Sequence, residues 1–331
     1  MHEAIDTPAI SSIDLGAFLN GTTNEQAEIS AAVDEICQST GFLIIENHQV
    51  PAQIISNAWT ATRTFFDLPL EEKLAAKSVD PKCPRGYFPM ASEALAKSLG
   101  VDTPPDIKES FGIGPLSAPP IELTAAEHEF YFGDNLWPPS LPNLEDSLTT
   151  YFDAMTELCG NVLRLFAAAL EMPHDYFESF HTHPMSALRC INYPGSNEPL
   201  LPMQKGAGEH SDYGSITILK SDPNIPGLEI KLASGKWAKA PLVDDAFIVN
   251  IGDMMARWTN DRWVSTLHRV IQASDPEGGP ARRQSMAFFD NTNLDSVIEC
   301  IPSCLAPGEQ PKYEKVVSGP YLQSRFESAI D

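Results

Sequence analysis

The sequence predicts a mainly β fold, a sandwich or jelly roll, with supporting helices before and after the strands. Two observations lead to this prediction. Between residues 186 and 301, short β-branched or aromatic segments recur, and each is bounded by Gly, Pro, Asp or Asn. Many short strands at this spacing are typical of a jelly roll. Before them, helical patterns and a few strand-like runs give residues 1–120 an α/β character, so we expect this part to support the core.

The α/β support begins with a short strand expected over residues 9–15 and a buried strand over residues 41–45. Between them, residues 27–39 place apolar side chains on one stripe, which predicts a helix. Pro51 suits the first turn of another helix, and Leu68-Pro69 ends it, because a residue before proline avoids helical geometry.

The middle of the chain is read as loops followed by one long helix. Residues 80–143 are rich in Pro and Gly, and we expect loops around short strands such as Phe111–Gly114. Residues 148–170 carry apolar side chains at helical spacing, so this helix should pack on the outside of the β core.

The jelly-roll core is expected over residues 186–301, where four strands stand out. They lie at residues 215–219, 227–230, 247–251 and 285–289. A last helix is expected over Pro320–Ile330, within a C-terminal segment of residues 318–331. No linker divides the chain, which predicts one domain over residues 1–331.

The composition excludes several classes of function. The 331 residues include 22 basic and 45 acidic side chains, a net charge of −23, so we expect no nucleic-acid partner. The chain opens with polar and acidic residues, and no apolar run is long enough to span a bilayer. Six scattered cysteines without a Cys-x-x-Cys pair indicate free thiols. We therefore expect a cytoplasmic protein, and nothing in the chain demands a partner, so we expect a monomer.

A metal site is suggested by His210-x-Asp212. On a strand, residues two apart point to the same face, so both side chains could reach one metal ion. The pair is weak evidence alone, because about one His-x-acid pair is expected by chance with eight His and 45 acidic residues. His268 is the candidate third ligand, although a lone His is more often a satisfied core residue. Turn signals before it can return a strand to the first two ligands.

A carboxylate site is suggested by Arg283-x-Ser285. On a strand the guanidinium and the hydroxyl share a face and can hold a carboxylate by charge-assisted hydrogen bonds. The alternative is a surface Arg on an edge strand. Tyr193 could give a third donor, or it could be a buried tyrosine with a satisfied hydroxyl.

Substrate contacts are expected from Arg189, Tyr213 and Phe289. If Tyr193 faces the barrel interior, strand alternation puts Arg189 there as well. A buried Arg needs an anionic partner, which suggests an acidic or carbonyl-bearing substrate, but an internal ion pair is equally compatible. Tyr213 follows Asp212, and Phe289 lies four residues after Ser285, so both could flank a planar ligand or could be core aromatics.

Taken together, these motifs resemble the isopenicillin-N-synthase-like branch of the iron(II)/2-oxoglutarate-dependent dioxygenases, nearly end to end. The resemblance rests on the joint order of motifs rather than on any one of them. They are Gly41-Phe42 to Asn47-His48, Arg85-Gly86-Tyr87, Lys108-Glu109-Ser110-Phe111, His210-Ser211-Asp212-Tyr213-Gly214, Val249-Asn250-Ile251-Gly252-Asp253, Ser265-Thr266-Leu267-His268-Arg269-Val270 and Pro311-Lys312-Tyr313-Glu314.

The resemblance implies a distorted double-stranded β-helix (jelly roll) core. His210, Asp212 and His268 then match the iron(II) ligands, and Arg283, Ser285 and Tyr193 match the residues that bind the far carboxylate of 2-oxoglutarate. One position departs from the family, because Ile191 stands where plant members often carry Asn, which leaves the contacts to the near carboxylate open.

The implied activity is oxidation of an unactivated C–H bond of a small organic molecule. Iron(II), 2-oxoglutarate and O2 would be consumed together, with succinate and CO2 as products, and the outcome could be hydroxylation, desaturation or ring closure. Two alternatives stay open. One is an iron oxidase of the same fold that needs no 2-oxoglutarate, and the other is a silent binding module.

Overall fold

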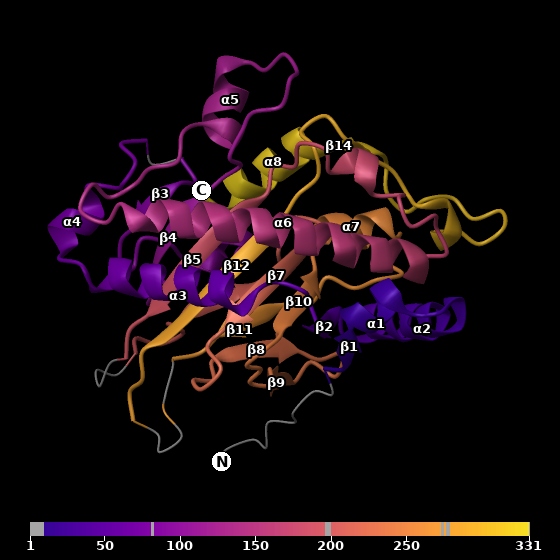
Figure 1. Cartoon of the computed structure of the whole chain (residues 1–331), viewed down its shortest axis with the longest axis horizontal. Coiled ribbons are helices and arrows are strands. Elements are labelled where there is room, and N and C mark those ends of the chain that lie inside the picture. The colour runs from indigo at the N-terminus through magenta and orange to yellow at the C-terminus, as the bar shows by residue number, and fades with distance from the viewer. Residues whose placement is uncertain (1–9, 81–82, 196–199, 273–274, 276–278, 331) are drawn as a thin grey trace.

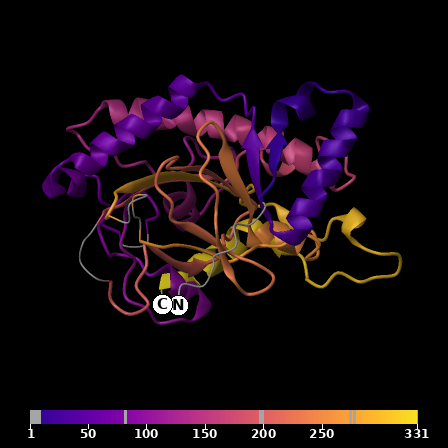
Figure 2. The same cartoon turned by 90° about the horizontal axis from the view of Figure 1, so that it is seen from below.

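Two β-sheets face one another, and helices cover the outer face of the larger sheet (Figure 1, Figure 2). The structure is a computed structural model that describes residues 10–80, 83–195, 200–272, 275 and 279–330. Within these residues the large sheet has the strand order β1-β2-β10-β7-β12-β5-β4-β3, and the small sheet has the order β6-β11-β8-β9. A ribbon of β13 and β14 lies apart from them. This facing pair of sheets is the predicted jelly-roll core.

The elements of the described residues have the following bounds. The strands are β1 (Ser12–Asp14), β2 (Phe42–Glu46), β3 (Gly86–Phe88), β4 (Glu109–Ile113), β5 (Ala187–Tyr193), β6 (Ala207–His210), β7 (Ile216–Ser221), β8 (Leu228–Lys231), β9 (Trp237–Lys239), β10 (Phe247–Ile251), β11 (His268–Val270), β12 (Arg283–Asp290), β13 (Val297–Ile298) and β14 (Val316–Val317). The helices are α1 (Leu15–Asn20), α2 (Thr23–Ser39), α3 (Ala52–Asp67), α4 (Leu70–Leu74), α5 (Ala125–Phe132), α6 (Asn143–Ala169), α7 (Asp253–Trp258) and α8 (Ser318–Ile330), with short 3-10 turns η1 (Leu95–Leu99), η2 (Glu178–Phe180) and η3 (Pro302–Cys304).

The predicted elements are present, with shifted boundaries. The first strand is shorter than expected, because Asp14 caps α1 by accepting a hydrogen bond from the Ala17 amide. Helix α2 begins four residues earlier than predicted, because Thr22 and Glu25 form a capping box. Among the described residues between 80 and 143, the sequence did not predict the 3-10 turn η1 or the helix α5, which starts at a second capping box built from Thr124 and Glu127.

Helix α6 packs on the outer face of the large sheet, as its apolar stripe predicts, and crosses in front of the strands in Figure 1. Phe152 of α6 meets Phe288 of β12 edge-on at 5.1 Å, and both side chains are buried. Burial of one such side chain stabilises the fold by about 1.5–3 kcal/mol. In the part of the chain that the structure describes, no helix is long and apolar enough to cross a membrane.

The large sheet is completed by strands from the first third of the chain. Strand β2 pairs with β10, and β4 pairs with β5, so β1 to β4 flank the strands from residues 187–290 on both sides. The expected α/β support therefore contributes strands to the same sheet as the core.

Strand alternation divides the residues of the large sheet between its two faces. On β12, Gln284, Met286 and Phe288 face the helices, where Gln284 donates to the carbonyl of Trp59 in α3. Arg283, Ser285, Ala287 and Phe289 therefore face the space between the two sheets. Apolar residues of both sheets pack together there and form a core cluster separate from the one beneath the helices; it includes Ile44, Ile191, Ile230 and Ile248. The predicted site residues on β12, namely Arg283, Ser285 and Phe289, point into this space.

Candidate metal centre and co-substrate site

His210, Asp212 and His268 converge between the two sheets. His210 ends β6 and His268 begins β11, and the two are direct cross-strand partners with ring centroids 4.4 Å apart. Asp212 Oδ1 lies 4.0 Å from Nε2 of His210 and 3.7 Å from Nε2 of His268. Strand β6 stops at His210, so Asp212 reaches the site from the turn that leads to β7 rather than from a shared strand face.

Each of these side chains is oriented by a hydrogen bond on the side away from the others. Nδ1 of His210 lies 2.7 Å from the carbonyl of Gly208, and Nδ1 of His268 lies 3.1 Å from the carbonyl of Thr266. A carbonyl only accepts, so both Nδ1 atoms donate and both Nε2 lone pairs face the centre. Second-sphere contacts of this kind fix the tautomer of metal-binding histidines.

Asp212 is held by two donors on one oxygen. Oδ2 accepts hydrogen bonds from Thr217 Oγ1 at 2.6 Å and from Asn250 Nδ2 at 2.7 Å. Oδ1 carries no hydrogen bond from the described residues and faces the two imidazoles. The ligand atoms of the three residues lie within 4.8 Å of one another. Two nitrogens and one free carboxylate oxygen, with the rest of the sphere open, are the donor set of non-haem iron(II) oxygenases.

The protonation states also suit a cation. Burial, and next the proximity of His268, lower the pKa of His210 well below its ordinary value, so this ring is neutral at pH 7. Burial alone would raise the pKa of Asp212, but His268 and His210 hold it below its ordinary value. Neutral imidazole and ionised carboxylate are the forms that bind metal.

Arg283 is buried on the inner face of β12 with unsatisfied donors. Its Nη2 donates to Ser221 Oγ at 2.8 Å, whereas Nε and Nη1 have no hydrogen-bond partner in the described part of the chain. Burial lowers the pKa of Arg283, and Tyr193 and Asp222 oppose this effect. A buried guanidinium with two orphaned N–H groups is costly unless an anion completes it. The residues therefore fit a carboxylate such as that of 2-oxoglutarate.

Tyr193 and Ser285 lie beside Arg283. Tyr193 is the cross-strand partner of Arg283, and its ring centroid lies 5.1 Å from the guanidinium carbon. Ser285 lies opposite Ile191 on one side and Ser221 on the other. Ser221, which sequence reasoning missed, thus contributes a second hydroxyl to this end of the site.

Arg189 is on the same inner face but already has an anionic partner. Its Nη1 donates to Glu93 Oε1 at 2.6 Å, and its guanidinium carbon lies 4.4 Å from the centroid of the Phe88 ring. Arg189 thus forms the internal ion pair that the sequence left open, and it does not require an acidic substrate.

Phe289 and Tyr213 have different surroundings. Phe289 faces the space between the sheets, where Thr217, the donor to Asp212, is its cross-strand partner. Tyr213 lies against α8, with its ring 4.9 Å from the guanidinium carbon of Arg325 and edge-on to Phe326. Both are only partly buried. Phe289 therefore lies near the three candidate ligands, whereas Tyr213 packs against the C-terminal helix α8.

Besides Ser221, three supporting residues were not predicted, namely Thr217, Asn250 and Glu93. Asn250 belongs to a motif that the sequence singled out, but its role as a donor to Asp212 depends on a contact between residues 38 positions apart. Glu93 lies in the Pro- and Gly-rich region that was read as loops.

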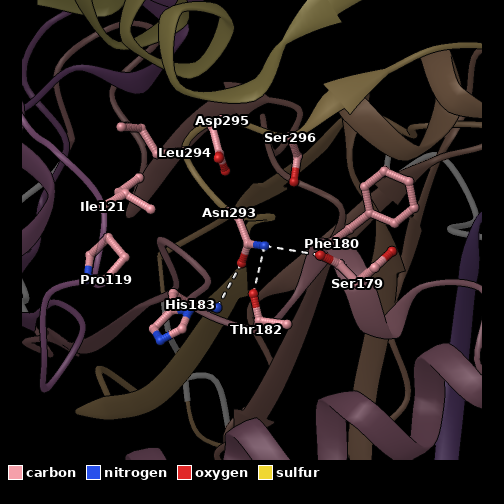
Figure 3. A pocket seen from close by; sticks show the side chains of 10 residues that line it. All are labelled: Pro119, Ile121, Ser179, Phe180, Thr182, His183, Asn293, Leu294, Asp295 and Ser296. Carbon is pink, nitrogen blue, oxygen red and sulfur yellow. Dashed lines mark hydrogen bonds between the residues drawn. The ribbon is translucent and has the colours of Figure 1, made fainter.

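A surface pocket of about 400 Å³ lies elsewhere in the molecule (Figure 3). Asn293 is at its centre, where its side chain bonds to Thr182, the carbonyl of Ser179 and the amide of His183. None of the predicted site residues lines this pocket.

Two family descriptions match the chain. Residues 10–140 match the non-haem dioxygenase in morphine synthesis N-terminal family, and residues 183–292 match the 2OG-Fe(II) oxygenase superfamily. The 2-oxoglutarate-Fe(II) type oxidoreductase hxnY of Emericella nidulans is 34% identical, over 94% of this chain and 89% of that protein. Homoarginine-6-hydroxylase 2-ODD-233 of Oryza sativa subsp. japonica is 31% identical, over 96% of this chain and 93% of that protein.

Solved structures agree with these matches. Full-length Neurospora crassa T7H in complex with alpha-KG has a TM-score of 0.85 and 31% identity, covering 99% of this chain and 98% of that chain. The same protein in complex with alpha-KG and thymine has a TM-score of 0.84 and 32% identity, covering 96% of each chain.

These matches extend over nearly the whole length of relatives that carry the same chemistry. The chain therefore belongs to the isopenicillin-N-synthase-like branch of the iron(II)/2-oxoglutarate-dependent dioxygenases, enzymes that use iron(II), 2-oxoglutarate and O2 to oxidise a C–H bond of a small molecule, with succinate and CO2 as products.

Proposed function

We propose that His210, Asp212 and His268 bind the catalytic iron(II), and that Arg283 and Ser285, assisted by Tyr193, bind the far carboxylate of 2-oxoglutarate. The observation that carries the proposal is the orientation of the donors. Both Nε2 atoms and one oxygen of Asp212 face a common centre, while hydrogen bonds occupy the opposite atoms. The orphaned donors of Arg283 support the second part.

The side chains have distinct tasks in this reaction. Iron(II) at the three ligands would supply O2 activation coupled to the oxidative decarboxylation of 2-oxoglutarate. Arg283 and Ser285 hold the co-substrate in one orientation, because a guanidinium and a hydroxyl fix a carboxylate from two sides. Thr217 and Asn250 keep the free oxygen of Asp212 aimed at the centre. The apolar residues between the sheets exclude water from the reacting C–H bond.

We propose a planar or partly apolar substrate with a polar edge. Phe289 offers an aromatic face on the inner side of β12, and Tyr213, which follows Asp212 and packs against α8, is the second aromatic residue that we assign to the substrate. Arg189 can donate to a carbonyl of the substrate. The thymine complex of Neurospora crassa T7H, a protein similar over almost the entire chain, supports a ligand of this shape.

We also propose that the chain is one domain and acts as a cytoplasmic monomer without a nucleic-acid partner. The sharing of one sheet by β1–β4 and by β5, β7, β10 and β12 supports the single domain. The net charge of −23 opposes binding to nucleic acid, and six free cysteines suit a reducing compartment. Light scattering that gives the mass of two chains would contradict the monomer.

Succinate formation tests the proposed function. Protein loaded with iron(II) without oxygen should form succinate when 2-oxoglutarate and O2 are added, and the rate should rise with a suitable small molecule. Asp212→Ala should lose this activity, since the remaining two imidazoles lack a charged ligand. Asp34→Asn, on α2 away from the site, is the control. A fully active Asp212→Ala protein would refute the ligand assignment, and turnover without succinate would instead favour an oxidase that needs no 2-oxoglutarate.

A further inference from the structure

Four charged side chains form a chain of alternating sign between β5 and β6. Arg189 donates to Glu93 Oε1 at 2.6 Å, and Lys108 Nζ lies 3.2 Å from Glu93 Oε2 and 3.8 Å from Asp106 Oδ2. The side chains of Lys108 and Asp106 are only 5% and 2% exposed, whereas those of Arg189 and Glu93 are 22% and 24% exposed. The chain of charges therefore has a buried end and an accessible end.

The buried end supports the strand that carries His210. Asp106 Oδ1 accepts from the Gly208 amide at 2.8 Å, and Asp106 Oδ2 accepts from the Leu95 amide at 3.0 Å. The carbonyl of Gly208 in turn accepts from His210. The role of this end is structural, so a ligand would meet only Arg189 and Glu93.

The accessible end lies inside the proposed substrate space. Ala287, the cross-strand partner of Arg189, is between Ser285 and Phe289 on the inner face of β12. Along the sheet, Arg189 therefore lies between the level of Ser285 and the level of Phe289. Phe289 is the cross-strand partner of Thr217, which donates a hydrogen bond to Asp212. A molecule positioned for oxidation at the three candidate ligands would pass this side chain.

The charges at this end are already balanced. Two cations and two anions alternate along the chain, and Glu93 stays ionised because, although burial opposes it, Arg189 and then Lys108 lower its pKa to about 2. A substrate carboxylate at Arg189 would lie beside the carboxylate of Glu93, where like charges repel. Arg189 donates only through Nη1 among the described residues, so Nε and Nη2 remain for a ligand. The Phe88 ring holds the guanidinium plane.

We propose that the Arg189–Glu93 pair determines specificity and selects neutral substrates that present a hydrogen-bond acceptor beside a donor, as an amide, lactam or cyclic imide does. The proposal rests on the proposed function, because it assigns the substrate of the same site. A carbonyl oxygen accepts from Arg189, and the adjacent N–H donates to Glu93. A carboxylate offers no donor to Glu93 and adds a negative charge.

Binding to matched ligand pairs tests this inference without turnover. Protein loaded with Zn(II) in place of iron and saturated with 2-oxoglutarate is titrated calorimetrically with benzamide against benzoate, and with nicotinamide against nicotinate. Within each pair, we expect the neutral compound to bind roughly ten-fold or more tightly, the effect of about one charge-assisted hydrogen bond. Tighter binding of both carboxylates, or no binding of either neutral compound, would overturn the inference.

Glu93→Gln assigns the effect to this pair. The variant keeps the size of the side chain but leaves the positive charge of Arg189 without its carboxylate partner, so the preference for the neutral compound should fall roughly ten-fold. Asp34→Asn is the matched control. Asp34 lies on α2, away from the site, and is also a partly exposed carboxylate paired with an arginine, with its Oδ2 at 2.7 Å from Nη2 of Arg262. An unchanged preference in Glu93→Gln, with an unchanged melting temperature, would overturn the inference. Succinate formation by the iron-loaded protein is measured separately, so failure of the proposed function is distinguished from failure of this selectivity.

Discussion

Asn250 determines how Asp212 presents its free oxygen. It shares Asp212 Oδ2 with Thr217 and so leaves Oδ1 for a metal ion. Asn250→Ala should weaken iron(II) binding about 10- to 100-fold, the usual effect of losing a second-sphere partner. The measurement is competition with a calibrated chelator. The control is Asn135→Ala, which removes a partly buried hydrogen bond that Asn135 Oδ1 accepts from the Gly114 amide at 2.8 Å, and this variant should leave the metal affinity unchanged. Equal affinities of the Asn250→Ala and native proteins would contradict the role given to Asn250.

Arg283 has a geometric role that lysine cannot fill. Lysine would keep the positive charge but lose the planar fork, and it could not donate to Ser221 and to a carboxylate from fixed positions. Arg283→Lys should therefore raise the KM for 2-oxoglutarate roughly ten-fold or more. The neighbouring Arg282 faces the other side of β12, where it donates to Asn192, so Arg282→Lys is the control. A larger effect from the control would show that the clamp is misassigned.

At the scale of elements, His181 joins η2 to the end of β12. Its Nε2 lies 2.8 Å from Asp290 Oδ2, and its Nδ1 lies 3.0 Å from the carbonyl of Phe177, so both nitrogens face acceptors. Burial alone would lower the pKa of His181, but the charge of Asp290 and the hydrogen bond to it raise the pKa above its ordinary value. The imidazolium is therefore the form that the fold stabilises.

The raised pKa predicts how this contact depends on pH. Its stabilisation is fully present below about pH 6.5, the pKa of His in the unfolded chain, and is lost as the pH rises through the higher folded pKa. At pH 6, His181→Gln should lower the free energy of unfolding by about 3 kcal/mol or more, because the charge of Asp290 loses its partner. The difference from the native protein should shrink at pH 9. Urea denaturation at both pH values measures it, with His183→Gln as the control, and a difference that grows with pH would reverse the assigned sign.

The sequence predicted the helices and strands better than it predicted the hydrogen-bond partners of the site residues. The apolar stripe of residues 148–170 placed α6 on the sheet, because a one-sided pattern leaves one solution for burial. The His-x-Asp spacing pointed to two candidate ligands that lie together even though Asp212 lies beyond the end of β6, since a tight turn keeps neighbours close. Glu93 and Asn250 could not be assigned, because each bonds to a residue far away in the sequence, Arg189 and Asp212 respectively. Thr217 is only five residues from Asp212, but its contact depends on the course of the turn between β6 and β7.

At the scale of the whole molecule, the net charge of −23 opposes the approach of 2-oxoglutarate, which carries two negative charges. Local attraction by Arg283 acts only near its buried site, whereas repulsion from the surface acts over the Debye length, about 30 Å at 0.01 M salt and about 8 Å at 0.15 M. Added salt should therefore raise kcat/KM for 2-oxoglutarate, by roughly two-fold or more over this range. Steady-state succinate formation in NaCl and in KCl measures the effect and separates it from specific ion binding. A kcat/KM that falls with salt would mean that positive charge at the mouth of the site, and not the overall charge, governs how the co-substrate arrives.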